Sequence, residues 1–174
     1  MAEFNELSEL KNPEGVLAVV AQAENTELQS VASVVLEDIQ DPGNLGTILR
    51  MADWWGFKQI ICTKGSVDCY HSKTLRASMG AIFRVNVVYL EDILSLLKIK
   101  KEEVVIADLS EQSISSTALS KKNYFVFGNE ANGISASIRS EGFEVFSLEK
   151  KGEAESLNVA MACMGILTLA KQST

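Results

Sequence analysis

The feature that most constrains the fold is an alternation of short apolar runs with segments of helical periodicity. Runs such as Ser33–Leu36 and Glu103–Ala107 are rich in Val and Ile, which is typical of strands buried on both faces. Strands that alternate with helices join through right-handed crossovers into a mostly parallel sheet, so the sequence predicts an α/β fold. The predicted strands are Gly15–Ala21, Ser33–Leu36, Gln59–Cys62, Val85–Tyr89, Glu103–Ala107, Tyr124–Phe127 and Phe143–Leu148, and the predicted helices are Pro42–Gly56, Ser72–Met79, Leu90–Leu97, Ser135–Ser140 and Ser156–Lys171.

The first helix has clear signals at both ends. Asp41 is suited to cap it, Pro42 fits the first helical position and Gly56 is a candidate to end it. A helical wheel predicts that one broad apolar face is buried and that the opposite face is polar. The apolar face holds Leu45, Ile48, Leu49, Met51, Ala52 and Trp55, and the opposite face holds Gly46, Arg50 and Asp53.

The charge of the chain is uneven. Its 174 residues suit one domain, and the net charge of −7 is unfavourable for a nucleic-acid partner. Residues 1–40, however, hold one base against eight acids, whereas residues 41–174 hold 15 of each. Composition therefore neither suggests nor excludes RNA.

Several classes of protein are disfavoured. The three cysteines have no metal-ligand spacing and are expected to be buried free thiols in a reducing cytoplasm. No signal peptide is indicated, and the most apolar stretch, Leu157–Ala170, is too short to cross a bilayer. His71 is the only histidine and is expected in a loop, so neither a Ser-His-Asp triad nor a zinc centre is indicated.

Three polar segments follow predicted strands, at the sheet edge where ligands bind in such folds: residues 41–47, 128–133 and 149–158. The second, Gly-Asn-Glu-Ala-Asn-Gly, is neither a dinucleotide fingerprint nor a Walker A loop. Each segment also has a plain structural interpretation. Glu130 could be a solvated carboxylate in a turn, Ser156 a helix cap and Arg50 a solvated helix arginine. From the residues alone, the chain is a small-ligand-binding α/β domain.

Four segments taken together resemble the SpoU (TrmH-type) branch of the SPOUT RNA methyltransferases. Residues 41–52 (DPGNLGTILRMA) look like the first family motif, and residues 76–84 (RASMGAIFR) like a segment that follows it. Residues 127–134 (FGNEANGI) look like the second motif and residues 155–160 (ESLNVA) like the third. Each is weak alone, but their order and spacing agree across residues 31–172.

The resemblance implies a C-terminal deep trefoil knot, an exception to the rule that chains do not thread loops. It also implies S-adenosylmethionine bound in that knot, without a metal ion. Two departures touch the cofactor loops: Ser147 follows Phe146 where the family usually has Pro, and Ala131 and Asn132 stand where Gly is frequent. The implied cofactor-binding residues are Ala107, Asp108, Leu109, Phe127, Gly128, Asn129, Glu130, Ser147, Leu148, Ser156 and Leu157.

The implied reaction is methyl transfer to the 2′-hydroxyl of a ribose in tRNA or rRNA. This hydroxyl is a poor nucleophile, and Arg50 is the family's match for the group that stabilises its alkoxide. The residues that match its positioning groups are Asn44, Glu130, Ser156 and Asn158. The family also implies a homodimer in which Arg50 acts on the partner's cofactor.

Residues 1–12 are expected to be a linker tail or a disordered N-terminus, and residues 13–174 the methyltransferase domain. The chain would then be a catalytic fragment or a short homologue without its own RNA-docking module. Two alternatives remain: a knotted RNA-binding or ribosome-assembly domain without turnover, and a generic nucleotide-binding domain. A neutral core is expected to bind RNA weakly, so another domain or the second subunit would supply much of the affinity.

Overall fold

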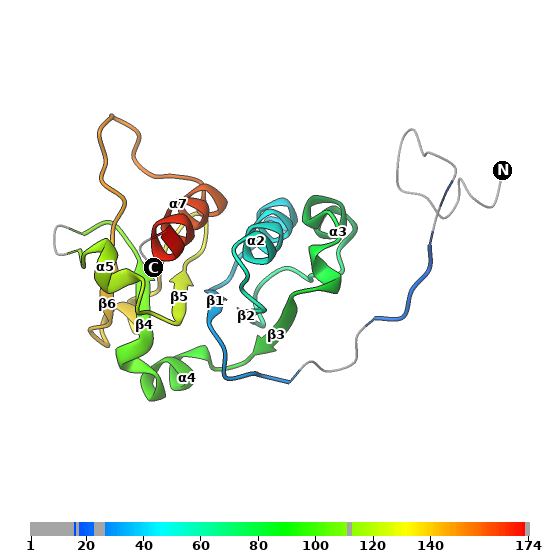
Figure 1. Ribbon diagram of the computed structural model, residues 1–174, viewed down its shortest axis with the longest axis horizontal. Helices are drawn as coiled ribbons and strands as arrows, with labels where there is room; N and C mark the ends of the chain where they lie inside the picture. The colour runs from blue at the N-terminus through cyan, green and yellow to red at the C-terminus, as the bar shows by residue number, and fades with distance from the viewer. Residues whose placement is uncertain (1–15, 17, 23–26, 111–112, 173–174) are drawn as a thin grey trace.

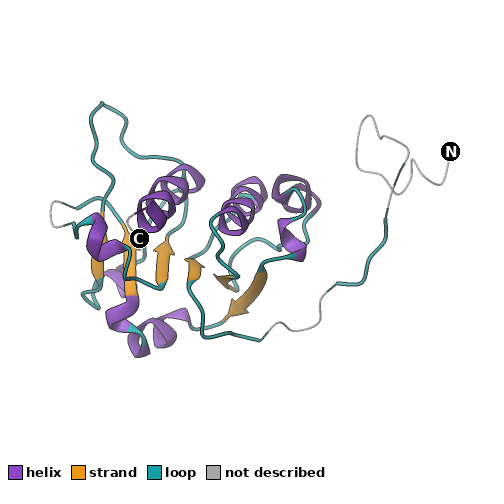
Figure 2. Cartoon of the chain, in the orientation of Figure 1, coloured by secondary structure: helices purple, strands orange, loops and turns teal. Residues whose placement is uncertain are grey.

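A parallel sheet with helices on both faces forms the body of the protein (Figures 1 and 2). The computed structural model describes residues 16, 18–22, 27–110 and 113–172. Within this part of the chain, six parallel strands run in the order β3-β2-β1-β5-β4-β6. The strands are β1 (Ser33–Leu36), β2 (Gln59–Thr63), β3 (Asn86–Leu90), β4 (Val104–Ala107), β5 (Tyr124–Phe127) and β6 (Glu144–Phe146). The predicted parallel α/β architecture is therefore confirmed.

The helices divide between the two faces of the sheet. Alternate strand residues point to opposite faces, so Val34 packs on one face and Val35 on the other. The first face is covered by α2 and α7, and α4 and α6 cover the second. The helices are α2 (Pro42–Trp54), α3 (Ser72–Ser78), α4 (Ile93–Ile99), α5 (Ser116–Leu119), α6 (Ala136–Arg139) and α7 (Val159–Gln172), with 3₁₀ turns η1 (Ala81–Phe83) and η2 (Lys101–Glu103).

The predicted strand Gly15–Ala21 is not part of the sheet. Its described residues, 16 and 18–22, have no regular structure, and they lie apart from the domain (Figure 1). Val16 and Val19 are 87% and 88% exposed. An apolar run forms a strand only when it pairs with a neighbouring strand, and none of the six strands pairs with the described residues of this run. The expected linker tail at 1–12 lies outside the described residues.

Helix α2 begins and ends as predicted. The Asp41 side chain accepts a hydrogen bond from the Asn44 N–H at 2.9 Å, and Gly56 has a left-handed φ of 76° just beyond the helix. The expectation that Gly46 lies on an exposed face is wrong, because α3 packs directly against it. A Cβ at Gly46 would lie 2.5 Å from the Thr74 carbonyl oxygen and 2.6 Å from the Ala77 Cβ.

Replacing Gly46 by alanine is expected to push α3 away from α2 and to lower the free energy of unfolding by about 1–3 kcal/mol. The clash is with backbone, which cannot move aside as a flexible side chain would. Gly152→Ala is the matched control, because a Cβ there meets nothing within 4 Å. Urea denaturation of both variants measures the effect, and equal midpoints would contradict the close packing of the two helices.

Candidate functional site

The candidate site lies at the switch point of the sheet. From β1 the chain builds outward through β2 and β3, and the later strands occupy the other side, so the neighbours β1 and β5 are where the order reverses. Ligands in open α/β sheets bind beyond the carboxyl ends of the strands at this point. The loop after β1 leads into α2, and the loop after β5 is residues 128–133. Both predicted loops therefore meet at one edge.

The Glu130 carboxylate joins these two loops. It accepts hydrogen bonds from the backbone N–H groups of Gln40 and Asp41, each at 3.1 Å, and from Asn44 Nδ2 at 3.0 Å. Partial burial on its own would raise the pKa of this carboxyl, but the hydrogen bonds from Asn44 and the two backbone groups outweigh burial and hold the pKa below its ordinary value. Glu130 thus lies in an exposed turn, as the structural interpretation predicts, and its ionised carboxylate also joins the two loops through hydrogen bonds.

The third segment reaches the same point through Asn158. Its Nδ2 donates to Asn44 Oδ1 at 3.0 Å, and its Oδ1 accepts from the Ala160 N–H at 2.9 Å at the start of α7. Asn44 consequently uses both ends of its amide, one toward Glu130 and one toward Asn158. Residues 114 positions apart in the chain are fixed in one hydrogen-bonded row.

The cap of α7 differs from the prediction. The helix begins at Val159, so Asn158 caps it in place of Ser156. Ser156 and Leu157 lie in an exposed loop before the helix, and the structure gives no hydrogen bond from Ser156 to Asn44 or Glu130. A serine and an asparagine two residues apart are both good caps, and the local pattern cannot distinguish them.

Asn129, named above as an implied cofactor-binding residue, and further residues that sequence reasoning did not single out hold the two loops together. Asn129 Nδ2 donates to the Asp38 carbonyl oxygen at 2.7 Å, while its Oδ1 accepts from the N–H groups of Ala131 and Asn132. Asp38 has a left-handed φ of 52°. Glu37 accepts from the Ser135 N–H at 2.8 Å. Among these residues, only Asn129 could be found from the sequence, by its position in the second motif.

Lys73 from α3 lies at the edge of this cluster. Its Nζ is 2.8 Å from Asp41 Oδ2, and this contact with the ammonium group, followed by the Asn44 N–H bond, lowers the pKa of the Asp41 carboxyl. His71 is exposed, as expected for a loop residue, and its Nδ1 accepts from the Lys73 N–H at 3.1 Å at the start of α3. Sequence reasoning missed Lys73, because nothing local indicates that it reaches α2.

The cluster opens into a hollow of about 560 Å³. Its lining residues come from all three segments: Gln40, Asp41, Asn44, Asn129, Glu130, Ala131 and Asn158. Arg50 does not line it. It lies on the exposed side of α2, six residues beyond Asn44. A single chain therefore brings together Asn44, Glu130 and Asn158, and leaves Arg50 and Ser156 outside.

The remaining predicted cofactor residues follow three adjacent strands, β6, β4 and β5. Ala107 ends β4, and Asp108 beyond it pairs with Arg139 at 2.9 Å. The Ser147 N–H after β6 donates to Ser113 Oγ at 2.9 Å, and Leu148 packs against the core. Phe127 is buried at the end of β5, and Gly128 follows it where a Cβ would lie 2.2 Å from Gly133 backbone atoms. Only glycine fits that position.

All three cysteines are buried free thiols, as predicted. Burial raises the pKa of the Cys69 thiol to about 11, with a smaller opposing effect from the Tyr89 hydroxyl. In the part of the chain that the structure covers, no three His, Cys, Asp or Glu side chains are grouped to hold a metal ion. The described helices include none with the length and apolar character that a membrane span requires.

Comparison with known proteins gives a family match. A family model described as the SpoU rRNA Methylase family matches residues 32–168. The 23S rRNA (guanosine(2553)-2′-O)-methyltransferase RlmP of Bacillus subtilis is 29% identical over 91% of this chain and 65% of its own length. Human mitochondrial rRNA methyltransferase 3 is 37% identical over 49% of this chain and 23% of its own. The chain thus spans less than two thirds of these relatives.

Solved structures match over most of the chain. A protein from Porphyromonas gingivalis, assigned to the TrmH family of RNA methyltransferases, has a TM-score of 0.85 at 30% identity, covering 98% of this chain and 71% of that one. An AdoMet-bound rRNA methyltransferase from Sinorhizobium meliloti has a TM-score of 0.73 at 29% identity, covering 83% and 57%. The similarity therefore includes the sheet and its flanking helices.

Proposed function

Because the chain belongs to the SpoU rRNA methylase family, we propose that it transfers a methyl group from S-adenosylmethionine to the 2′-hydroxyl of a ribose in RNA. The observation that carries the proposal is the row Glu130–Asn44–Asn158 at the switch point of the sheet. These residues come from the three segments that resemble the family motifs. The B. subtilis and human relatives described above are named as rRNA methyltransferases, which makes rRNA the first substrate to test.

The chemistry of the loops after β4, β5 and β6 fits this cofactor. These loops offer backbone amide and carbonyl groups beside apolar side chains, among them Leu109 and Leu157, which are 66% and 57% exposed. Exposed leucines beside loop backbone suit an adenine ring, which needs apolar faces and hydrogen bonds at its edge. When bound, S-adenosylmethionine supplies the electrophilic methyl group. The residues that would hold it are Ala107, Asp108, Leu109, Phe127, Gly128, Asn129, Glu130, Ser147, Leu148, Ser156 and Leu157.

The protein's own contribution to the reaction is positioning and charge. A ribose hydroxyl has a high pKa and attacks efficiently only as the alkoxide, so negative charge develops on its oxygen as the hydroxyl proton passes to water. A guanidinium stays protonated at neutral pH, so Arg50 stabilises the developing alkoxide rather than removing its proton. Asn44, Glu130 and Asn158 fix the loops that hold the two reactants in place. Ser156 presents a hydroxyl in the loop just before α7.

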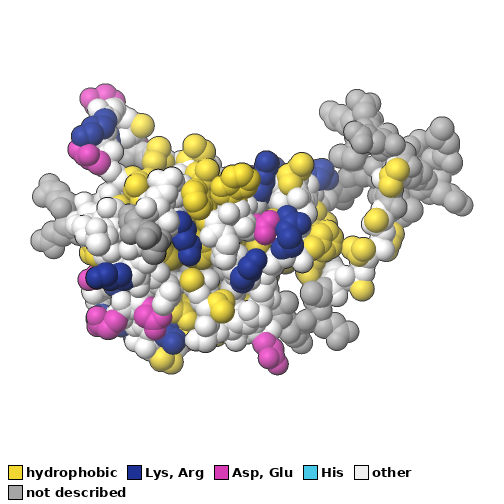
Figure 3. All heavy atoms as spheres, in the orientation of Figure 1, with side chains coloured by type: hydrophobic (Ala, Val, Ile, Leu, Met, Phe, Trp, Pro, Cys, Tyr) yellow, Lys and Arg dark blue, Asp and Glu magenta, His cyan; other side chains and the backbone are white. Residues whose placement is uncertain are grey.

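A second copy of the chain would bring Arg50 into the site. Arg50 lies outside the hollow of its own subunit, and exposed Met161 and Met164 lie on α7, which packs beside α2 on the same side of the sheet (Figure 1). Hydrophobic side chains are exposed over this part of the molecule (Figure 3). Pairing two copies through these helices buries this apolar surface and moves Arg50 toward the Asn44 cluster (Asn44, Glu130 and Asn158) of the partner subunit. The deep trefoil knot is likewise part of the proposal, formed by the segment from β5 to α7. The free thiols suit the cytoplasm.

Calorimetric titration with S-adenosylmethionine, followed by transfer of a tritiated methyl group to rRNA and to tRNA, tests the function. We expect cofactor binding and label in 2′-O-methylated nucleosides after RNA digestion. The Arg50→Ala variant is the control for adventitious activity. Absence of cofactor binding contradicts the proposal, and label found only on bases contradicts the ribose assignment.

A further inference from the structure

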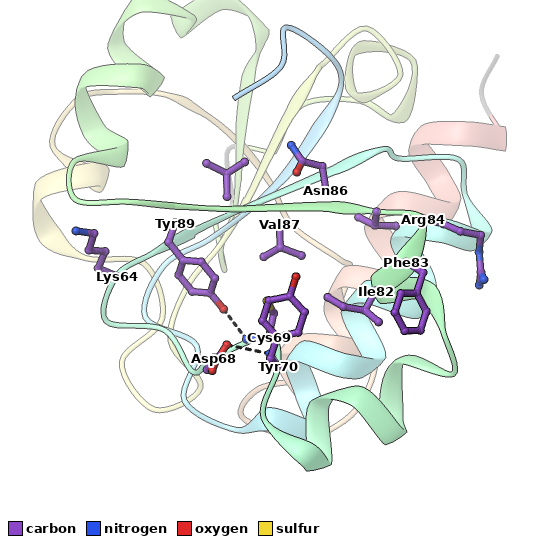
Figure 4. Close-up of a pocket in the computed structure, with 12 residues that line it drawn as sticks. Lys64, Asp68, Cys69, Tyr70, Ile82, Phe83, Arg84, Asn86, Val87 and Tyr89 are labelled. Atoms are coloured by element: carbon purple, nitrogen blue, oxygen red, sulfur yellow. Dashed lines mark hydrogen bonds between the residues drawn. The ribbon is translucent and has the colours of Figure 1, made fainter. Parts of the chain in front are cut away.

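A second groove shares no lining residue with the hollow at the cluster of Asn44, Glu130 and Asn158. It has a volume of about 590 Å³ and runs along β3, the edge strand of the sheet (Figure 4). Residues 68–70 form one wall, and the η1 turn with Arg84 forms the other. The proposed methyl transfer assigns no role to this groove.

Aromatic side chains line the groove. Phe83 projects from the η1 turn and is 72% exposed, an unusual position for a large apolar ring. Tyr70 and Tyr89 face the same space (Figure 4). The Tyr89 hydroxyl donates to the Val67 carbonyl oxygen at 2.7 Å and accepts from the Cys69 N–H at 2.8 Å, so its ring is fixed in place. Exposed aromatic rings are platforms on which unpaired nucleic-acid bases stack, and Phe83 is the exposed ring here, beside the half-buried Tyr70 and Tyr89.

Cations stand at the two ends of the groove. Lys64, which pairs with Glu91, lies at one end, and Arg84 lies at the other (Figure 4). Arg84 is held by Asp53 through Nε at 2.8 Å, yet its side chain remains 55% exposed. Asp68 is the acid among the lining residues, and its Oδ1 already accepts from the Tyr70 N–H.

The charge of the surrounding segment agrees with an anionic ligand. Residues 41–84, which include both walls, hold six Lys and Arg against three acids, whereas residues 85–174 hold nine against twelve. The segment that contributes both walls of the groove thus has a net positive charge, in contrast to the segments before and after it. Positive side chains interleaved with exposed aromatic rings favour single-stranded RNA.

Helix α3 connects the groove to the Asn44 cluster. Tyr70 is three residues from Lys73, a distance of at most about 10 Å, and Lys73 pairs with Asp41 at the edge of the cluster. The close contact of α3 with Gly46 fixes this spacing. One strand of RNA can therefore occupy both sites.

We propose that the groove between η1 and β3 binds an unpaired nucleotide of the RNA that flanks the methylated ribose. This proposal rests on the proposed function for the identity of its ligand. Phe83 stacks on the base, and Arg84 and Lys64 contact the phosphates. The groove thereby adds affinity that the cluster around Asn44, which is lined by the carboxylates of Asp41 and Glu130, lacks.

Fluorescence anisotropy with a labelled single-stranded RNA of mixed sequence, at low salt and without cofactor, tests the groove. Phe83→Ala is expected to weaken RNA binding by about 5- to 100-fold, the usual cost of removing one stacking platform. Phe83→Trp is expected to restore it. Ile99→Ala is the matched control, because Ile99 on α4 is an equally exposed apolar side chain, at 79%, outside the groove.

The outcomes separate the two proposals. If the wild-type protein binds both RNA and S-adenosylmethionine but Phe83→Ala binds RNA equally well, the proposed nucleotide-binding role of the groove is wrong. The proposed methyltransferase function is then unaffected. A wild-type protein that binds no RNA overturns both. Sedimentation measures the oligomeric state of Phe83→Ala. If that state changes while the RNA affinity does not, this surface contacts a second copy of the chain and the proposed RNA groove is wrong.

Discussion

Replacing Arg50 by alanine is expected to lower the rate of methyl transfer by about 100- to 1000-fold, the usual effect of removing one group that stabilises developing negative charge. The affinity for S-adenosylmethionine and the free energy of unfolding should stay near their wild-type values. The Arg50 side chain is exposed on α2 and makes no hydrogen bond with another described residue, so its loss leaves no buried group unsatisfied. Single-turnover transfer of tritiated methyl groups measures the rate, and calorimetry measures the cofactor affinity.

Lys58→Ala is the matched control for Arg50→Ala, because Lys58 is an exposed cation beyond the far end of α2. Arg50→Lys is expected to recover only part of the rate, since an ammonium cannot reproduce the guanidinium fork. Equal rates in Arg50→Ala and wild type would remove Arg50 from the mechanism. A parallel loss of cofactor affinity would assign it to cofactor binding.

The position of Arg50 also makes the dimer testable. If Arg50 serves the partner's site, a mixture of Arg50→Ala and Asn44→Ala chains should recover activity that neither has alone. Random pairing of equal amounts places one intact site in half of the dimers, so we expect about a quarter of the wild-type rate. No recovery, with mixed dimers shown by mass spectrometry, would place Arg50 in its own subunit's site.

The sheet was predicted well because each of its strands is a short run of apolar residues that can be recognised locally in the sequence. Strands β1 and β5 have the predicted bounds, and each is buried along its full length. Gly15–Ala21 has the same composition but no partner strand, and composition does not report pairing. The prediction for Gly46 was wrong for a related reason. A helical wheel identifies the face toward the sheet, but the contact with α3 depends on a second helix that the wheel does not include.

The site was predicted in part. Asn44, Glu130 and Asn158 were singled out by their motifs, but their hydrogen bonds span 86 and 114 positions and no local pattern encodes them. Glu130 was assigned to positioning without a geometry, and the structure supplies one, a carboxylate that accepts from two backbone groups and a side-chain amide. The contacts made by Lys73 and by the Asn129 side chain depend on how the loops pack together, and no local sequence pattern predicts that packing.

Glu130→Gln is expected to lower the free energy of unfolding by about 1–2 kcal/mol at pH 7, and the transfer rate by about 100-fold through misplaced loops. Glutamine keeps the size of the side chain but offers one acceptor and two donors where three N–H groups point at the carboxylate. Urea denaturation measures the first effect. Glu155→Gln is the matched control, since Glu155 is an exposed carboxylate outside the cluster.

The pH dependence distinguishes a charged brace from a simple packing role. The pKa of the folded Glu130 carboxyl lies below its ordinary value of 4.5, so its stabilising contribution is complete above that value and is lost as the pH falls through the folded-state pKa. The difference in unfolding free energy between wild type and Glu130→Gln should therefore shrink below about pH 4.5. A difference that stays constant from pH 7 to pH 3 would mean that the charge of Glu130 does not hold the two loops together, and that its shape does.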